Sequence, residues 1–426
     1  MMRNIYLHGA LNLAASAASS DHDGLSFPRD PNRTRHIRVG VTWTQPDLVA
    51  RKAPGEYHIF NGDIWDREVE AAPLNTRGWV LQERALAPRI LHFGKSQLYW
   101  QCNAIFHSEM FPSDLKVKNL GPHVPRVTSN FTACLRRLRE MAPVGGRAWK
   151  REREEAHARW SELVNAYSAT ALTRAEDKLI AVQALAETML DATGDTYVAG
   201  LWKSRIVEDV LWRTDVDDLP KGVAVRRPRE WRAPTWSWAS LDCKAEARSV
   251  YHYTGPLEWS GKSFVSEMAP SVEGFAGVST GQLRSASLQV RGLLYRNRFA
   301  FAMRTLESPL SLYRPADEST PWSFKIVLDE WDEEAVRGPE YSVPAGTLFF
   351  TVGSPIAGTI EGLVLKSVAG RGYQFRRTAY FEADISYDST EDILKGSGVL
   401  ENADKLDLLR DGEDVKGRLM YRFTLI

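Results

Sequence analysis

Glu83 is the residue of this sequence whose setting most strongly suggests chemistry. It lies in the segment PLNTRGWVLQERALAPRILHFGKSQLYWQC, residues 73–102. Residues 76–87 are predicted to form a helix, because one stripe of it carries side chains at positions i, i+3, i+4 and i+7: Trp79, Gln82, Glu83 and Leu86. A carboxylate on an apolar stripe is costly unless it is paired or neutralised, and such carboxylates are typical of functional sites.

A structural role for Glu83 is the alternative. The carboxylate has possible ion-pair partners in Arg77, Arg84 and Arg89, or it accepts hydrogen bonds from the backbone. Either arrangement would keep Glu83 charged without any chemistry.

The elements that position Glu83 are a helix and a hairpin. Pro88 ends the predicted helix, because the residue before a proline avoids the α region. Residues 89–93 and 97–102 are then predicted to be strands around a loop at residues 94–96. The second strand places Trp100 in alternation with Tyr99 and Gln101. Gln82, Tyr99 and Gln101 are polar candidates for a pocket wall, although packing of the hairpin explains them equally well. His92 is mid-strand with no second histidine at metal-ligand spacing, which favours a satisfied interior or edge histidine.

A second unusual stretch is RAPTWSWAS, residues 232–240. Pro234 fixes φ, and Trp236 and Trp238 are predicted to lie on one face. The pair is either an aromatic clamp for a ligand or a seal at a junction between domains, and we favour the seal.

Composition narrows the function classes. Lys+Arg and Asp+Glu both count 54, which argues against a general nucleic-acid or anionic-membrane surface. The cysteines Cys102, Cys134 and Cys243 lack metal-ligand spacing and are expected to be small buried hydrophobes without disulfides. We found no run of apolar residues long enough to span a membrane, so a cytoplasmic protein is expected. No GxSxG, Walker, HExxH or GxGxxG motif in the right context appears, so spacing alone does not show an enzyme.

The order of predicted elements gives an α+β fold. Residues 3–18 are predicted to be a helix and residues 36–43 a strand. Helices follow from residue 129, and a capping box at Thr173–Glu176 predicts a helix start, with Lys178 solvated. The C-terminal part is predicted to be antiparallel β-structure with six recognisable strands at residues 287–295, 324–331, 347–353, 360–368, 380–385 and 418–426.

Several of these stretches together resemble the fungal heterokaryon incompatibility (HET) domain. The segment that carries the resemblance most specifically reads like the motifs RxWxxQE, xRxLxFG and WxC. The matching residues are Pro73-Leu74, Arg77–Arg84, Pro88–Phe93 and Gln97–Cys102. Further stretches resemble what usually surrounds this domain: Met2–Ala18, Trp160–Tyr167, Leu172–Ala181, Tyr197–Trp202, Leu211-Trp212, Arg232–Ser240, Glu361–Leu365 and Arg376-Arg377.

The resemblance also has a gap. The SYxWG-type and WIDxxCINQ-type motifs that normally open the domain do not occur in this sequence. We therefore expect three regions: the C-terminal half of a HET domain with a partial TIR-like α/β fold at residues 1–104, a helical connector at 105–247, and a β-rich domain at 248–426.

Three functional hypotheses follow. The resemblance implies a signalling and interaction module for nonself recognition that triggers programmed cell death, with protein partners or self-association and no cofactor. By analogy with TIR domains, it also allows an NAD hydrolase, with Glu83 as the catalytic candidate. A degenerate fragment is the third hypothesis, and it predicts exposed apolar surface around residues 5–14 and 37–43. The candidate site residues are Arg77, Trp79, Gln82, Glu83, Arg89, Trp100, Trp236 and Trp238.

Overall fold

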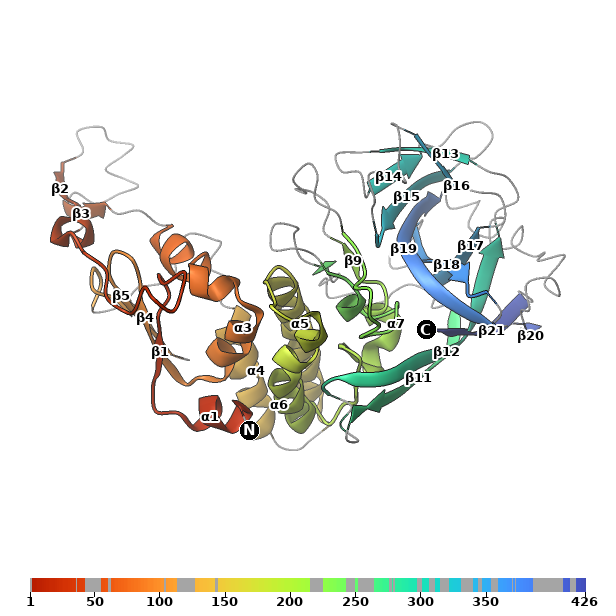
Figure 1. Ribbon diagram of the computed structural model, residues 1–426, viewed down its shortest axis with the longest axis horizontal. Coiled ribbons are helices and arrows are strands. Elements are labelled where there is room, and N and C mark those ends of the chain that lie inside the picture. Colours follow the sequence, from red (N-terminus) through yellow and green to blue (C-terminus); the bar gives the residue numbers. More distant parts are fainter. Residues whose placement is uncertain are drawn as a thin grey trace. The chain divides into compact units, whose positions relative to one another are not determined.

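The fold is given by a computed structural model of the 426-residue chain (Figure 1). The residues that it describes are 2–35, 37–42, 55–59, 63–102, 105–112, 127–141, 145–214, 225–242, 250–251, 264–275, 278, 280–296, 301–305, 311–314, 322–330, 340–343, 347–353, 359–369, 371, 373–385, 409–413 and 419–426.

The chain divides into two compact units, residues 1–134 and residues 135–426. Helices and strands occur in both, and the second unit ends in a β-rich region, so the predicted α+β class is confirmed. The three-part domain division remains a prediction, and its boundary residues 104 and 247 lie outside the described residues.

The first unit is built on a small sheet with the strand order β1-β4-β5-β6. Its strands are β1 (Asn12–Ala14), β4 (Arg89–Phe93), β5 (Leu98–Cys102) and β6 (Phe106–Ser108). The predicted hairpin is confirmed: β4 and β5 are antiparallel, with Arg89 opposite Cys102 and Phe93 opposite Leu98. A separate pair joins β2 (Ile37–Val41) to β3 (Gly55–Ile59).

In the sequence, one helix of the first unit precedes β1 and another precedes β4. Helix α1 spans Met2–His8, and α3 spans Gly78–Leu86. A π-helical turn (Asp66–Glu70) and a 3-10 turn (Pro73–Thr76) precede α3. The predicted helix over residues 3–18 is therefore wrong after His8, because residues 12–14 instead pair in parallel with β4. Ladder hydrogen bonds with β4 outweigh the helical preference of this alanine-rich segment.

Helices α5 (Arg147–Ser168), α6 (Gln183–Thr193) and α7 (Ile206–Asp209) belong to the second unit, and α4 (Val127–Glu140) contains the division point between the units. Helix α6 ends at Gly194, whose φ of 65° is the left-handed conformation that glycine adopts at low cost.

The capping box expected at Thr173 is not formed. The chain enters a 3-10 turn at Ala175–Lys178, and the α-helix begins at Gln183. Two carbonyls of the turn are bound from outside: the Tyr167 hydroxyl donates to the Lys178 oxygen at 2.7 Å, and Arg232 donates to the Ala175 oxygen at 3.0 Å. These bonds compete with the helical pattern. Lys178 is also buried over the Tyr167 ring, so its predicted solvation is wrong.

Eleven strands of the described C-terminal part form one sheet (Figure 1). Its order is β16-β13-β14-β15-β19-β18-β17-β12-β21-β20, with β11 on β12, and β19 also pairs in parallel with β21. The strands are β11 (Val265–Gly274), β12 (Leu283–Arg296), β13 (Phe301–Thr305), β14 (Ser311–Arg314), β15 (Trp322–Leu328), β16 (Glu340–Val343), β17 (Leu348–Gly353), β18 (Thr359–Ser367), β19 (Gln374–Ile385), β20 (Leu409–Glu413) and β21 (Leu419–Leu425). All six strands predicted here are present.

The second unit also contains two pairs of two-residue strands. Strand β7 (Tyr197–Val198) pairs with β8 (Leu201–Trp202), and β9 (Arg213–Thr214) pairs with β10 (Val250–Tyr251). Cys134 is buried and Cys102 is partly buried, both with free thiols, while Cys243 lies outside the described residues. Across the described residues, every helix is too short or too polar to cross a bilayer.

Candidate functional site

The motif residues of helix α3 differ in their exposure to solvent. Gln82 and Arg84 are buried together with Val80 and Leu86, whereas Trp79 and Glu83 are only partly buried. The predicted stripe therefore does not bury Glu83 among apolar side chains. The acidic side chain faces the boundary between protein and solvent.

Glu83 is held by a hydrogen bond from α1. The Tyr6 hydroxyl donates to its carboxylate, and Arg77 contributes a favourable positive charge. The hydrogen bond and the Arg77 charge both lower the pKa of Glu83, but partial burial outweighs them and raises this pKa above its ordinary value. Burial and the Glu83 charge together raise the pKa of Tyr6 to about 12, so Tyr6 remains a donor at neutral pH.

The strongest ion pair of the motif is made by Arg84, the residue that follows Glu83. The guanidinium binds both carboxylate oxygens of Glu70 at 2.9 Å, a bidentate geometry, and the Trp65 indole also donates to Glu70 at 2.9 Å. Burial alone would raise the pKa of Glu70, but the Arg84 charge and hydrogen bonds hold that pKa below its ordinary range. This pair fixes α3 against the π-helical turn.

A neutral histidine continues the buried network. His92 Nε2 lies 2.9 Å from Gln101 Oε1, and His92 Nδ1 lies 3.0 Å from the Ser16 hydroxyl. Because Arg84 also donates to Gln101 Oε1, at 3.5 Å, this oxygen is an acceptor. We therefore assign the proton to Nε2, so that Nδ1 accepts from Ser16. Burial, and then the Arg84 charge, lower the pKa of His92 to about 3.

This network stabilises the fold and offers no catalytic base. His92 is fully buried, so its ring nitrogens have no access to a ligand from solvent. Within the described residues, no group of three or more His, Cys, Asp or Glu side chains could hold a metal ion. Glu83, in contrast, is partly exposed and is the acid of this motif that solvent can reach.

The other candidates of the hairpin lie toward its surface. Arg89 is exposed and donates to the Ala10 carbonyl at 3.4 Å, and Trp100 is partly buried on the opposite face of β5 from Tyr99 and Gln101. The structure thus brings Glu83 close to Tyr6 and Arg77, while Arg89 and Trp100 join no polar cluster with it.

Trp236 and Trp238 belong to the second unit and are both completely buried. The Trp236 indole donates to the Leu425 carbonyl at 3.2 Å, next to the end of β21, and the Trp238 indole donates to the Gly200 carbonyl at 3.0 Å. A ligand clamp requires an accessible ring face, which these residues lack. They join the β7–β8 turn to the last strand, β21. The seal between domains that we favoured stays a prediction, because the predicted boundary at residue 247 lies outside the described residues.

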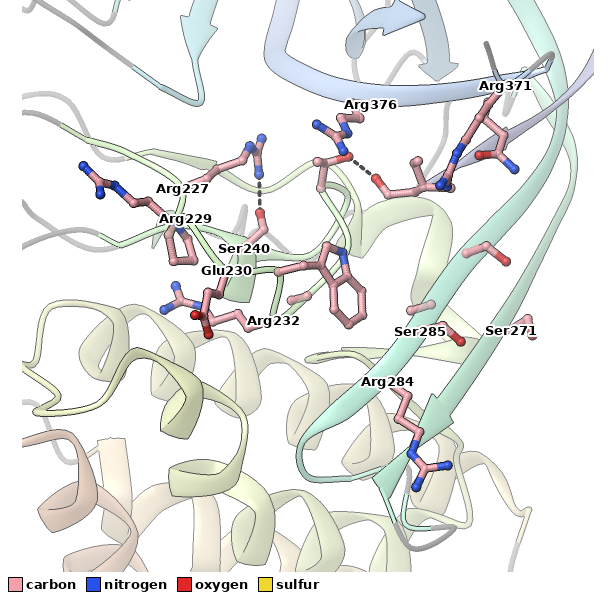
Figure 2. A pocket seen from close by; sticks show the side chains of 18 of the residues that line it. Arg227, Arg229, Glu230, Arg232, Ser240, Ser271, Arg284, Ser285, Arg371 and Arg376 are labelled. Atoms are coloured by element: carbon pink, nitrogen blue, oxygen red, sulfur yellow. Dashed lines mark hydrogen bonds between the residues drawn. The ribbon is translucent and has the colours of Figure 1, made fainter. Parts of the chain in front are cut away.

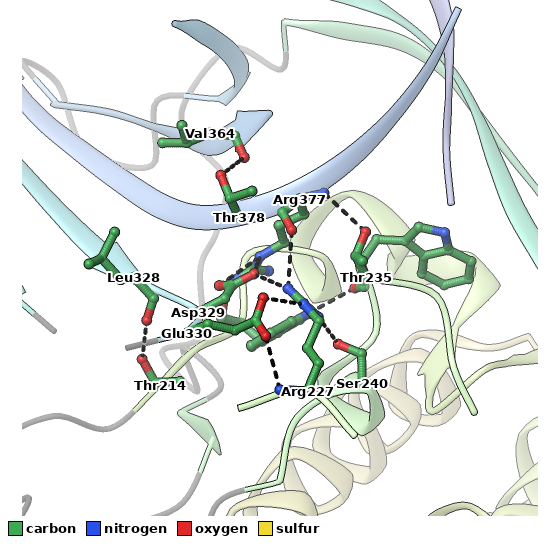
Figure 3. Close-up of polar contacts among 12 residues, drawn as sticks. Thr214, Arg227, Thr235, Ser240, Leu328, Asp329, Glu330, Val364, Arg377 and Thr378 are labelled. Carbon is green, nitrogen blue, oxygen red and sulfur yellow. Dashed lines mark hydrogen bonds and ion pairs between the residues drawn. The ribbon is translucent and has the colours of Figure 1, made fainter. Parts of the chain in front are cut away.

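The sequence reasoning missed a structural role for the buried side chain of Arg377 (Figure 3). Arg377 stacks 3.5 Å above the Trp212 ring, and it pairs with Asp329 at 3.0 Å. It also donates to the Val210 and Trp212 carbonyls. Arg227 reaches the same Asp329 at 2.8 Å. Arg377 thereby links the segment after α7 to strand β19.

The sequence reasoning also missed Glu70, Trp65 and Arg84 as one buried cluster. Their signal was weak, since Glu70 and Arg84 are fourteen residues apart and neither lies on a regular apolar pattern.

Comparison with known family models finds a match to the N-terminal part of the chain. A family model described as heterokaryon incompatibility protein (HET) matches residues 1–83. The N-terminal segment is HET-like. The match ends at Glu83 and includes Tyr6, Glu70 and Arg77, so the residues around the candidate acid lie within the HET segment. Neither the curated proteins nor the solved structures contain a significant match.

Proposed function

We propose that this protein acts in heterokaryon incompatibility as a signalling and interaction module, in which contact with a protein partner triggers cell death. The HET match over residues 1–83 carries the proposal. The protein would act in the cytoplasm, through a protein partner or a second copy of itself, and without a cofactor.

Exposed apolar side chains in the HET segment support an interaction role. Ile5 is 58% exposed, Leu11 43%, Leu13 54% and Ile37 64%. Leu13 lies in β1, one of the two outer strands of its sheet among the described strands. Outer strands with apolar side chains are ready templates for pairing with another chain. The degenerate-fragment hypothesis predicts the same exposure around residues 5–14 and 37–43, and it is present at these four positions. An effect of the wild-type protein on viability separates an interaction module from an inactive fragment.

Expression in a filamentous fungus tests the proposal. Induced wild-type protein is expected to reduce viability, and the variant Leu11→Ser/Leu13→Ser is expected to abolish this effect at equal protein level. Leu25→Ser is the matched control, because Leu25 is exposed to 38% outside the helices and strands of the segment. Killing by the double variant at wild-type strength would contradict the interaction surface.

A second candidate function is NAD hydrolysis, which the setting of Glu83 supports. A half-buried carboxylate with a raised pKa, hydrogen-bonded to a phenol, is a candidate for general acid–base work. Purified protein with NAD should then release nicotinamide, and Glu83→Gln should stop the release. No release from the wild-type chain would leave the interaction module as the remaining function.

A further inference from the structure

An open cavity of about 630 Å³ lies in the second unit, and none of the residues used above for the HET segment lines it (Figure 2). Its walls are the loop at residues 227–235, the adjoining ends of β11 and β12, and the start of β19. Volumes of this size are typical of small-molecule sites.

The wall is strongly basic. Six arginines line it, against the two acidic side chains Glu230 and Glu330. Two of the arginines are held by the protein itself. Arg227 pairs with Asp329 at 2.8 Å and with Glu330 at 3.2 Å, and buried Arg232 pairs with Asp242 at 2.6 Å. These two anchor the loop.

Three further arginines have no such anchor. Arg229, Arg371 and Arg376 are exposed, and within the described part of the chain their guanidinium groups make no hydrogen bond or ion pair. The fourth, Arg284, lies loosely opposite Glu273 at 3.9 Å. Positively charged side chains gathered at one cavity repel each other, and a bound anion would relieve this repulsion. A phosphate is a suitable anion, because a guanidinium group can donate two parallel hydrogen bonds to it.

Two uncharged groups complete the wall. Gln374 has a buried side-chain oxygen position with no hydrogen-bond partner. Since amide oxygen and nitrogen are assigned from their surroundings, the reversed orientation would present N–H donors at this position. Trp231 is 47% exposed, so a large aromatic face borders the same cavity.

We propose that this cavity binds a phosphate-bearing small molecule with a planar ring, of the nucleotide class. Arg229, Arg371 and Arg376 bind the phosphates, and Trp231 stacks on the ring. Base–aromatic stacking tolerates any base, so the site selects for the combination of phosphates and ring rather than for one base.

Calorimetric titration of the full-length protein with ATP and with inorganic triphosphate tests both parts of the site. Arg371→Gln/Arg376→Gln is expected to weaken both ligands roughly a hundredfold, about tenfold for each charged hydrogen-bonding group. Trp231→Ala is expected to weaken ATP roughly tenfold and to leave triphosphate within about twofold. Arg151→Gln, on the exposed side of α5, is the matched control and should bind both ligands as the wild type does.

Three results would overturn the proposal: no saturable ATP binding by the wild type, wild-type affinity in the arginine variant, or triphosphate binding as tight as ATP. Arg376→Gln alone replaces the double variant if thermal melting shows that the latter is unfolded. Glu83→Gln should keep ATP affinity unchanged, so loss of NAD hydrolysis and loss of this site are separate outcomes.

Discussion

At the scale of single residues, the HET segment contains two glutamates in different settings: Glu70 has a structural role and Glu83 is accessible to solvent. Glu70 is paired with a bidentate arginine, whereas Glu83 accepts a hydrogen bond from the Tyr6 phenol and lies near the positive charge of Arg77. Substitutions at the two sites should therefore have different effects. Removing Arg84, the partner of Glu70, should destabilise the fold, whereas Glu83 can be changed to test activity.

Replacing Arg84 by Met should destabilise the first unit by about 3–5 kcal/mol, because Glu70 would keep a buried charge without its counter-ion. Urea denaturation followed by circular dichroism measures the loss. Arg38→Met is the control, since the Arg38–Glu56 pair is exposed and should contribute at most about 1 kcal/mol. Equal losses for the two variants would contradict a buried pair.

His92 should make the stability of the protein depend on pH. Its pKa of about 3 in the folded chain lies below the ordinary 6.5, so protons bind preferentially to the unfolded state between these values. The stabilisation is complete above pH 6.5 and is lost as pH falls, by about 2 kcal/mol on reaching pH 5.

The difference between wild type and His92→Gln isolates this contribution from other groups. The free energy of unfolding of the wild type should fall more steeply between pH 6.5 and 5 than that of the variant. His22→Gln, at an exposed histidine, should follow the wild type. Parallel curves for wild type and His92→Gln would show that His92 is not held neutral.

At the scale of elements, the hairpin of the motif depends on one glycine. A Cβ at Gly94 would lie 2.7 Å from the Gln97 carbonyl oxygen and 2.8 Å from the Tyr99 ring. Both neighbours are fully buried, so neither can move away at low cost.

Gly94→Ala should therefore destabilise the protein by about 1–3 kcal/mol, the range for overpacking a well-packed site. Gly40→Ala in β2 is the control, because nothing lies within 4 Å of its added Cβ. Thermal melting compares the two variants. A Gly94→Ala melting temperature equal to that of Gly40→Ala would contradict the close packing of this turn.

The sequence predicted elements best where local signals agree. Helical spacing and Pro88 were sufficient for α3, and alternation was sufficient for β4 and β5. Strand-like stretches separated by Gly, Pro and Asp identified six of the C-terminal strands. Prediction failed where distant partners decide: residues 12–14 become a strand by pairing with β4, and the turn at residues 175–178 is held by Tyr167 and Arg232. Of the candidate site, Glu83 was found from its spacing, but its Tyr6 partner was not, since only the folded chain brings α1 to α3.

At the scale of the whole molecule, the second unit relies on a buried ionic centre. Asp329 is the counter-ion of Arg377, and both are almost completely buried (Figure 3). Burial lowers the pKa of Arg377 to about 10 even beside Asp329, so its guanidinium remains charged at neutral pH.

Asp329→Asn should destabilise the second unit by about 3–5 kcal/mol, because Arg377 and Arg227 would lose a shared counter-ion. Glu267→Gln is the control: its pair with Arg422, at 3.8 Å, is exposed and should contribute at most about 1 kcal/mol. Hydrogen exchange of strand β19 amides reports the change locally. Unchanged protection in Asp329→Asn would contradict the structural role of the centre.

The central claim is that the HET segment acts through interaction and not through hydrolysis of NAD. The most direct test induces wild-type protein and Glu83→Gln at equal levels in a filamentous fungus and measures viability and cellular NAD in the same cultures. We predict that both proteins reduce viability while NAD in the surviving cells stays at its starting level. Loss of NAD before death with wild type, and neither NAD loss nor death with Glu83→Gln, would contradict the claim.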